Sequence, residues 1–327
     1  MCQHTQLPDG LLTLIQQARE HYREPPPQSK RGKPRTYSGL SFLLLAVAAV
    51  TLRTFKASEL HRLLWRDAAL RQAIGLMSVP HRTTIERRLK TLLPEAETQV
   101  AALGRQVLAE VKPLAIQSQA SAIDGRMYEA SGPKWHKKHR LKGSIPARLR
   151  NVDTESRWFK SGYRGWVQGY RLVLQGLVFP HPVPLWATWQ PNSVGEATIM
   201  AQALAAQQLP VTAILLGDTT FGGAALTATY AAAGGWLLTP SQLPKERRSF
   251  KHDLYAYRKE TIELLFQRII QACDLKACPS KGLNRNGAFV IASVWLYQII
   301  FLCNYWAGRP VAHIKEQLEL ARWRIAP

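Results

Sequence analysis

Val211-Thr-Ala-Ile-Leu-Leu-Gly-Asp-Thr219 is the stretch of this 327-residue sequence that decides its fold. The largely apolar run from Val211 to Leu216 lacks the polar alternation of a half-exposed strand, which is typical of a strand buried on both faces of a parallel sheet. Helical patterns flank it over residues 194–208 and 223–233. A buried strand between two helices indicates helices packed against a sheet.

Three strand patterns precede this stretch, over residues 121–128, 166–178 and 183–189. Successive strands with short connections between them pair as an antiparallel meander. A short strand over residues 236–239 and a long helix over residues 255–272 follow the stretch. The predicted fold is therefore α/β, a mixed sheet of three antiparallel strands and then alternating helices and strands.

The chain divides into four predicted segments. Residues 1–37 form a basic, proline-rich arm or linker, because their three consecutive prolines break helices. Residues 38–112 form an N-terminal all-α helical region, because apolar helical patterns fill them. Residues 113–306 contain the sheet, and residues 307–327 form a C-terminal tail.

Short helical patterns around Gly75 and Pro80 make the helical region similar to a helix-turn-helix, with a plain helical bundle as the alternative. Thr83 or Thr84 can cap the basic helix that follows. In a helix-turn-helix the early residues of the second helix face the bases and phosphates of DNA. The candidate DNA contacts in this region are His81, Arg82, Arg87 and Arg88.

The balance of charge points to a polyanionic partner. The chain has 43 Lys and Arg against 22 Asp and Glu, a net charge of +21, and such a field attracts nucleic acid. Its 46% hydrophobic content is that of a globular protein able to bury a substantial core, so a disordered chain is not expected. Four cysteines without a regular framework favour a reducing compartment. The apolar stretches over residues 39–52 and 287–303 are shorter than the roughly 18–20 residues of a spanning helix, so we expect a cytoplasmic protein without a membrane partner.

Three acidic residues are candidates for one divalent-metal site. Asp124 lies in the first strand and Asp218 follows the fourth, and the ligands of open α/β sheets bind where strands end. Glu263 lies in the long helix beside the apolar face of Ile262, and Glu260, one turn earlier, is the alternative. Clustered carboxylates need a cation to stay ionised. Taken singly, the two aspartates can equally be a turn residue and a helix cap.

Further cations lie close to these acidic positions in the sequence. A segment around Trp135, directly after the first strand, can lie on DNA or form a solvated loop. Two residues at the start of the long helix can contact phosphate or solvate the helix. The candidate DNA contacts of these two segments are Lys134, Lys137, Lys138, Arg140, Arg258 and Lys259.

Three motifs together resemble a known family. Ile123-Asp-Gly, Leu216-Gly-Asp-Thr-Thr-Phe-Gly and Arg258-Lys-Glu-Thr-Ile-Glu are similar to the catalytic segments of bacterial insertion-sequence transposases, whose DDE catalytic domain has a ribonuclease-H-like fold. The resemblance covers residues 38–306 and makes residues 113–306 the catalytic domain. The family's signature has Arg four residues before the glutamate and Lys seven residues after it, where this chain has Lys259 and Ile270.

The resemblance implies a DNA transposase of a mobile element. Asp124, Asp218 and Glu263 would bind two Mg²⁺ ions, with Mn²⁺ able to substitute, and catalyse metal-dependent cleavage at the element ends and strand transfer into target DNA. The implied partners are double-stranded DNA and a second copy in a homodimer on that DNA, at the nucleoid of a bacterial cytoplasm. The alternatives are a nuclease of the same fold without strand transfer and a catalytically inactive DNA-binding copy.

Overall fold

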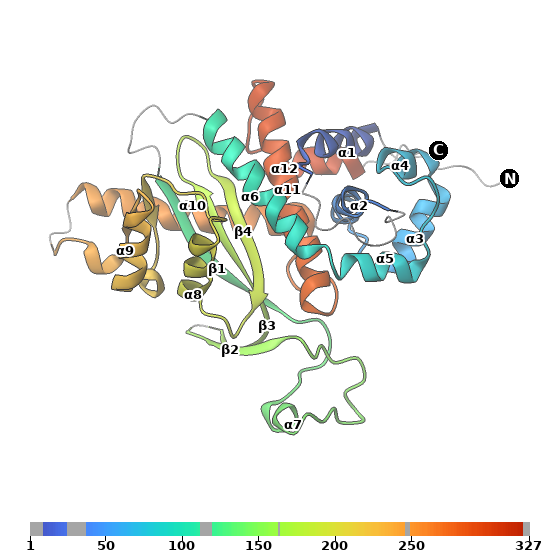
Figure 1. Ribbon diagram of the computed structural model, residues 1–327, viewed down its shortest axis with the longest axis horizontal. Coiled ribbons are helices and arrows are strands. Elements are labelled where there is room, and N and C mark those ends of the chain that lie inside the picture. Colours follow the sequence, from blue (N-terminus) through green and yellow to red (C-terminus); the bar gives the residue numbers. More distant parts are fainter. Residues whose placement is uncertain (1–8, 25–36, 112–119, 163, 246–248, 323–327) are drawn as a thin grey trace, which may run out of the picture.

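The central sheet of the protein is mixed and carries helices on both of its faces (Figure 1). The computed structural model describes residues 9–24, 37–111, 120–162, 164–245 and 249–322. Within these ranges the strands are β1 (Ala120–Glu129), β2 (Arg157–Ser161), β3 (Gly165–Leu177), β4 (Val183–Pro191), β5 (Ile214–Leu216) and β6 (Trp236–Leu238).

The strand order is β2-β3-β1-β5-β6, and β4 pairs with β3 outside this path. β1, β3 and β4 are antiparallel neighbours, whereas β5 pairs in parallel with both β1 and β6. Helix α8 (Glu196–Ala205) leads from β4 to β5, and α9 (Ala224–Ala232) leads from β5 to β6. The predicted ribonuclease-H-like order, three antiparallel strands followed by alternating helices and strands, is confirmed.

Two details of the sheet differ from the prediction. β5 has three residues rather than six, and Thr212 before it bonds through its hydroxyl to Ser121 and Tyr230 instead of extending the ladder. β2 and the short helix α7 (Lys137–Leu141) were not predicted. β2 pairs with Gly169 and earlier residues of β3, just past the point where β4 ends opposite Tyr170.

The alternation of side chains along the strands separates two layers of core. Ala122, Leu172 and Leu174 belong to one cluster with the long helices α10 (Phe250–Cys273) and α11 (Leu283–Trp306). Ile123 and Val173 belong to a second cluster with residues of α8 and α9. The sheet is therefore covered on both faces, which explains why β5 is apolar along its whole length.

The N-terminal all-α region is also confirmed. Within residues 38–112 its helices are α2 (Gly39–Leu52), α3 (Ala57–Arg66), α4 (Ala68–Ala73), α5 (Arg82–Leu89) and α6 (Leu93–Glu110), and α1 (Asp9–His21) precedes them. α6 packs on β4, and α11 packs on α6, α2 and β4, so these helices share one hydrophobic core with the sheet.

Two of the predicted segments contain a packed helix. α1 lies within residues 1–37, predicted as an arm, and α12 (Ile314–Arg322) lies within residues 307–327, predicted as a tail. α1 and α12 pack on each other through buried residues that include Leu11, Leu14 and Leu318. Apolar residues at helical spacing stabilise both segments against the main core.

Two apolar segments among the described residues meet the length and composition of a membrane span. One is α11, in which 94% of the apolar window is buried inside the protein, and the other is the bent pair of α2 and α3. Burial on all sides is the usual environment of a core helix that is apolar all round.

The close contact between α6 and β4 predicts that one added methyl group, at Gly104, lowers the stability of the fold. A Cβ atom on Gly104 of α6 would overlap the backbone carbonyl oxygen of Leu185, which cannot move without disturbing β4. We expect Gly104→Ala to lower the free energy of unfolding by about 1–3 kcal/mol or more in denaturant titrations. Gly223→Ala is the matched control, because a Cβ atom there meets no atom within 4 Å. An equal loss in both variants would contradict this packing.

Candidate metal centre

The candidate site lies where β1 continues past the end of β5. The parallel pairing of the two strands stops at Ala122 and Leu216, whereas β1 runs on to Glu129. Asp124 lies just beyond the last pair, and Asp218 follows two residues after β5 ends. Because parallel strands end at the same edge of a sheet, both carboxylates come to that edge, as the sequence predicted.

The local bonds of the two aspartates occupy only part of each carboxylate. Asp218 Oδ1 accepts a hydrogen bond of 2.8 Å from the backbone N–H of Thr220 and caps a 3-10 helix over Thr219–Phe221. Asp124 Oδ1 accepts one of 2.8 Å from the N–H of Gly125. The capping role of Asp218 is therefore present together with its place in the cluster.

The third carboxylate of the cluster is Glu196, at the start of α8. Asp124, Glu196 and Asp218 each offer one oxygen, and these oxygens all lie within 4.8 Å of one another. Glu196 was not predicted from the sequence. A usable signal was present, because β4 runs in the same direction as β1 and the helix after it begins at the same edge of the sheet.

Gly125 lets Glu196 reach this edge. α8 packs on the face of the sheet that carries Ile123, whereas Asp124 has the opposite orientation in the strand. A Cβ atom at position 125 would overlap the carboxylate of Glu196. The glycine after Asp124 therefore allows a carboxylate from the α8 face to meet one from the α10 face.

Two arginines partly balance the three carboxylates. Arg171 of β3 is 2% exposed, and its Nη1 lies 3.3 Å from Oε1 of Glu196 and donates a hydrogen bond of 3.2 Å to the carbonyl of Val194. Arg258 of α10 is 16% exposed, and its Nη1 lies 3.1 Å from Oδ2 of Asp124. With every group ionised, three negative and two positive charges leave the cluster one positive charge short of neutrality.

Two of the three carboxylates, those of Glu196 and Asp124, hold their protons more tightly than usual. Burial raises the pKa of Glu196 to about 7; Arg171 opposes this rise, and the charges of Asp124 and Asp218 add to it. Burial also raises the pKa of Asp124, with Arg258 opposing. A divalent cation would favour the ionised forms of all three groups. Since every donor is a carboxylate oxygen, the set fits hard cations such as Mg²⁺, Mn²⁺ or Ca²⁺.

The structure does not bring Glu263 to the two aspartates. α10 turns Arg258 toward Asp124, and residue 263 is five positions later, about 140° around the helix at 3.6 residues per turn. Glu263 is exposed, as is the alternative, Glu260, and neither belongs to the carboxylate group found among the described residues. The predicted apolar face is confirmed, because Ile262 is buried against the sheet.

The orientation of α10 can be compared with the signature of the family that the sequence resembles. Four residues after Arg258, where that signature carries its glutamate, the chain has Ile262. The cation that reaches the cluster is thus Arg258 and not Lys259, the residue four positions before Glu263. The third carboxylate is that of Glu196 on α8, and α10 supplies none.

Eight of the ten predicted DNA contacts lie on two surfaces apart from the cluster, whereas Arg258 and Lys259 lie on α10, where Arg258 pairs with Asp124 of the cluster. His81 and Arg82 are exposed at the start of α5, where His81 itself caps the helix in place of the predicted Thr83 or Thr84. Arg87 is exposed, and Arg88 lies over the ring of Phe42 at 5.2 Å. The second surface follows β1.

On that second surface, Lys137 and Lys138 are exposed and Arg140 is partly buried on α7. Lys134 pairs with Glu129 at 3.0 Å. Lys259 is exposed on α10, whereas Arg258 is engaged by Asp124. The DNA-binding role of all these residues stays a prediction.

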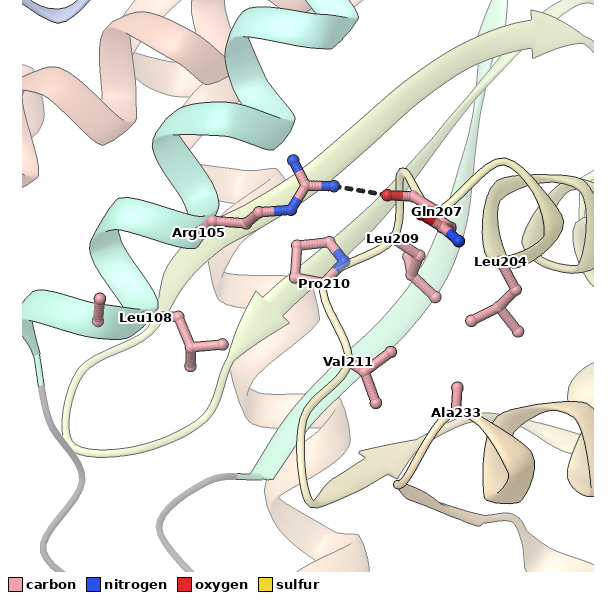
Figure 2. A pocket seen from close by; sticks show the side chains of 9 residues that line it. Arg105, Leu108, Leu204, Gln207, Leu209, Pro210, Val211 and Ala233 are labelled. Carbon is pink, nitrogen blue, oxygen red and sulfur yellow. Dashed lines mark hydrogen bonds between the residues drawn. The ribbon is translucent and has the colours of Figure 1, made fainter.

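A pocket of about 510 Å³ lies away from the carboxylates. Figure 2 shows Arg105 of α6 bonded to the backbone carbonyl of Gln207, with Leu209, Pro210 and Val211 along the same wall. This wall continues into Ile214, the first residue of β5, whereas Asp218 follows the last residue of that strand. The pocket has no acidic lining residue and is not part of the metal centre.

No protein-family model matches the sequence, and no curated protein matches it. Among solved structures, the chain is similar to the piggyBac transposase in a synaptic complex with hairpin DNA, with a TM-score of 0.43, 11% identity, and 96% of this chain and 76% of that chain covered. It is also similar to a pre-cleavage Mos1 transpososome, with a TM-score of 0.22, 10% identity, and 91% and 82% covered. At these values the strand order, rather than the likeness, assigns the fold.

The buried Arg171–Glu196 pair can be tested by a double-mutant cycle on the free energy of unfolding. Arg171→Met leaves Glu196 without its cation, and we expect a loss of about 3–5 kcal/mol in the free energy of unfolding. Adding Glu196→Gln should restore most of that loss, because the neutral amide needs no counter-charge. Guanidinium titrations of both single variants and the double variant measure the coupling. Additive losses in the double variant would rule out a direct pair.

A side chain at position 125 is predicted to weaken metal binding without unfolding the protein. The overlapping group is the end of a flexible side chain, so Gly125→Ala should fold normally but push the Glu196 carboxylate out of the cluster. Calorimetry with Mn²⁺ should show an affinity at least about tenfold lower than that of the unaltered protein. Gly223→Ala is again the control, and unchanged affinity in Gly125→Ala would show that Glu196 is not a ligand.

Proposed function

We propose that the chain is a divalent-metal-dependent DNA transposase, which cleaves a phosphodiester bond at the end of a mobile element and transfers the freed 3′ end to target DNA. The single observation that supports this most is the cluster of Asp124, Glu196 and Asp218, with one oxygen of each within 4.8 Å of the others. Such a cluster is expensive to keep in a folded protein without a cation. Its presence in a chain of net charge +21 favours a polyanionic substrate.

The proposed roles of the residues follow from their contacts. Asp124, Glu196 and Asp218 would hold the metal, two Mg²⁺ ions in the full form of the proposal, with Mn²⁺ able to substitute. The bound metal supplies Lewis acidity and lowers the pKa of the attacking water or hydroxyl. Arg171 keeps the Glu196 carboxylate turned to the edge of the sheet, and Arg258 supplies positive charge at Asp124.

Strand transfer, rather than hydrolysis alone, is supported by the sequence resemblance to insertion-sequence transposases. The proposal includes the predicted double-stranded DNA partners, a homodimer on DNA, action at the bacterial nucleoid, a catalytic domain over residues 113–306 and DNA contacts from residues 38–112. The proposal replaces Glu263 by Glu196 as the third acidic ligand, because Glu263 is exposed on α10.

The experiment is cleavage and joining of labelled duplex DNA that carries the native sequence flanking the gene, with Mg²⁺ or Mn²⁺. The unaltered protein should nick the end and join it to other DNA. Asp218→Asn and Glu196→Gln should lower both rates at least about a hundredfold, as expected for loss of a metal ligand. Glu263→Gln is the matched control and should keep rates within about threefold.

The other outcomes select the alternatives. Cleavage without joined products would replace the proposal by a nuclease of the same fold. DNA binding by every variant with no cleavage in either metal would replace it by a DNA-binding copy without activity. A loss of activity in Glu263→Gln with normal rates in Glu196→Gln would return the third ligand to α10 and contradict the cluster.

A further inference from the structure

The chain between the end of β1 and the first residues of β3 forms a projecting arm, described over residues 130–162 and 164–168. β1 runs on past Asp124, and the chain then forms α7 and β2 before β3 returns to the sheet. Figure 1 shows α7 and the loops around it beyond the end of the sheet, away from the helices that cover its faces. The arm therefore presents surface on several sides, and its two ends continue into β1 and β3, the strands that lead to the carboxylates.

The arm has an ordered interior. Trp135 is buried, and its indole N–H donates a hydrogen bond of 3.1 Å to the carbonyl of Ser144. Trp158 donates one of 2.8 Å to the carbonyl of Trp135, and its ring stacks on His136 at 6.2 Å between centroids. These contacts join the segment around α7 to β2, so side chains on the arm have defined positions.

The arm concentrates positive charge. It contains ten Lys and Arg and two acidic residues, which leaves +8 of the total +21. The two acidic residues, Asp153 and Glu155, accept hydrogen bonds from the backbone at the start of α11. Among the described residues, Lys134 with Glu129 is the one arm cation within 4.0 Å of a carboxylate. Arg157 and Arg164 each donate from Nη1 to backbone carbonyls, which leaves their charge unneutralised. The arm as a whole therefore attracts phosphates.

One aromatic side chain of the arm, Trp166, lies largely in solvent. Trp166 is 63% exposed at the start of β3, directly opposite the exposed Lys160 of β2 and two residues after the exposed Arg164. A large exposed ring between two cations is an arrangement that holds single-stranded nucleic acid, in which bases stack on the ring while the cations neutralise the backbone.

The strand register gives the distance from this ring to the cluster. Asp124 pairs with Leu174 of β3, and Trp166 lies eight residues earlier on the same strand. At roughly 3.3 Å per residue this separation is about 26 Å. A duplex advances 3.4 Å per base pair, so the ring lies about eight nucleotides from a phosphate bound at the carboxylates.

We propose that the arm tracks the DNA strand leading to the carboxylate cluster and that Trp166 stacks on an unpaired base about eight nucleotides from the reacting end. The distance rests on the proposed function, because it takes the cluster as the place where the end is bound. The stacking itself rests on the exposure of Trp166 and on its neighbouring cations. The ligand is thus DNA with a locally opened base pair rather than a uniform duplex.

The test is the affinity of the full chain for three labelled duplexes of one sequence, measured by fluorescence anisotropy with Ca²⁺ present to occupy the carboxylate cluster. One is fully paired, one has an unpaired base eight nucleotides from the end, and one has it sixteen nucleotides from the end. The unaltered protein should bind the second about five- to a hundredfold more tightly than the other two. Trp166→Ala should lose this preference and bind all three alike, and Trp166→Phe should keep most of it.

Two controls separate stacking from other effects. Trp306→Ala removes another half-exposed tryptophan, at the far end of α11, and should leave the preference unchanged. Replacing Lys137 and Lys138 by Gln should weaken binding of all three duplexes and reduce the slope of log affinity against log salt by about two. Thermal unfolding of each variant identifies any that fails to fold.

The outcomes also separate this proposal from the proposed function, because no cleavage is needed for the measurement. A Trp166-dependent preference in a protein that cuts no DNA would retain the stacking surface and overturn the transposase activity. A preference that persists in Trp166→Ala, or that is greatest with the unpaired base at sixteen nucleotides, would overturn the stacking proposal.

Discussion

The three-residue parallel pairing of β5 with β1 is the constraint on which the candidate site depends. Because the pairing ends at Leu216, the edge of β1 from Asp124 onward is left without a neighbouring strand. Asp218 and Glu196 reach that bare edge, one from the loop after β5 and the other from α8 across Gly125. A longer β5 would place backbone where the carboxylates now meet.

The edge of the sheet that holds the carboxylates also contains a buried ion pair, Arg171 with Glu196. Arg171 is removed from water beneath Glu196, and its Nε finds no partner among the described residues. A buried ion pair usually costs about as much in desolvation as its attraction returns, so it adds little to stability. The ion pair is better explained by its effect on position. Arg171 holds the Glu196 carboxylate, whose pKa is raised, at a site that still lacks one positive charge.

The long apolar helix α11 connects the two halves of the chain. It packs on β4 of the sheet and on α2 and α6 of the N-terminal region, and α6 approaches β4 so closely that Gly104 has no room for a side chain. The helical region is thus packed rigidly against the sheet. Its exposed basic helix α5 and the basic arm after β1 are therefore held in a defined relation to the carboxylates, as binding one continuous DNA would require.

By itself, the sequence determined the order of five of the six strands and of the helices between them, the mixed sheet and the meeting of Asp124 with Asp218, because side-chain periodicity and the shared edge of parallel strands are properties of local pattern. Only the tertiary structure decided the third carboxylate. Which side of α10 meets the sheet depends on packing, and one residue changes the direction of a side chain by about 100°, so Glu263 turned to solvent. Glu196 of α8 joined the aspartates through Gly125 of β1 and Arg171 of β3, and no periodicity within one segment records such a meeting.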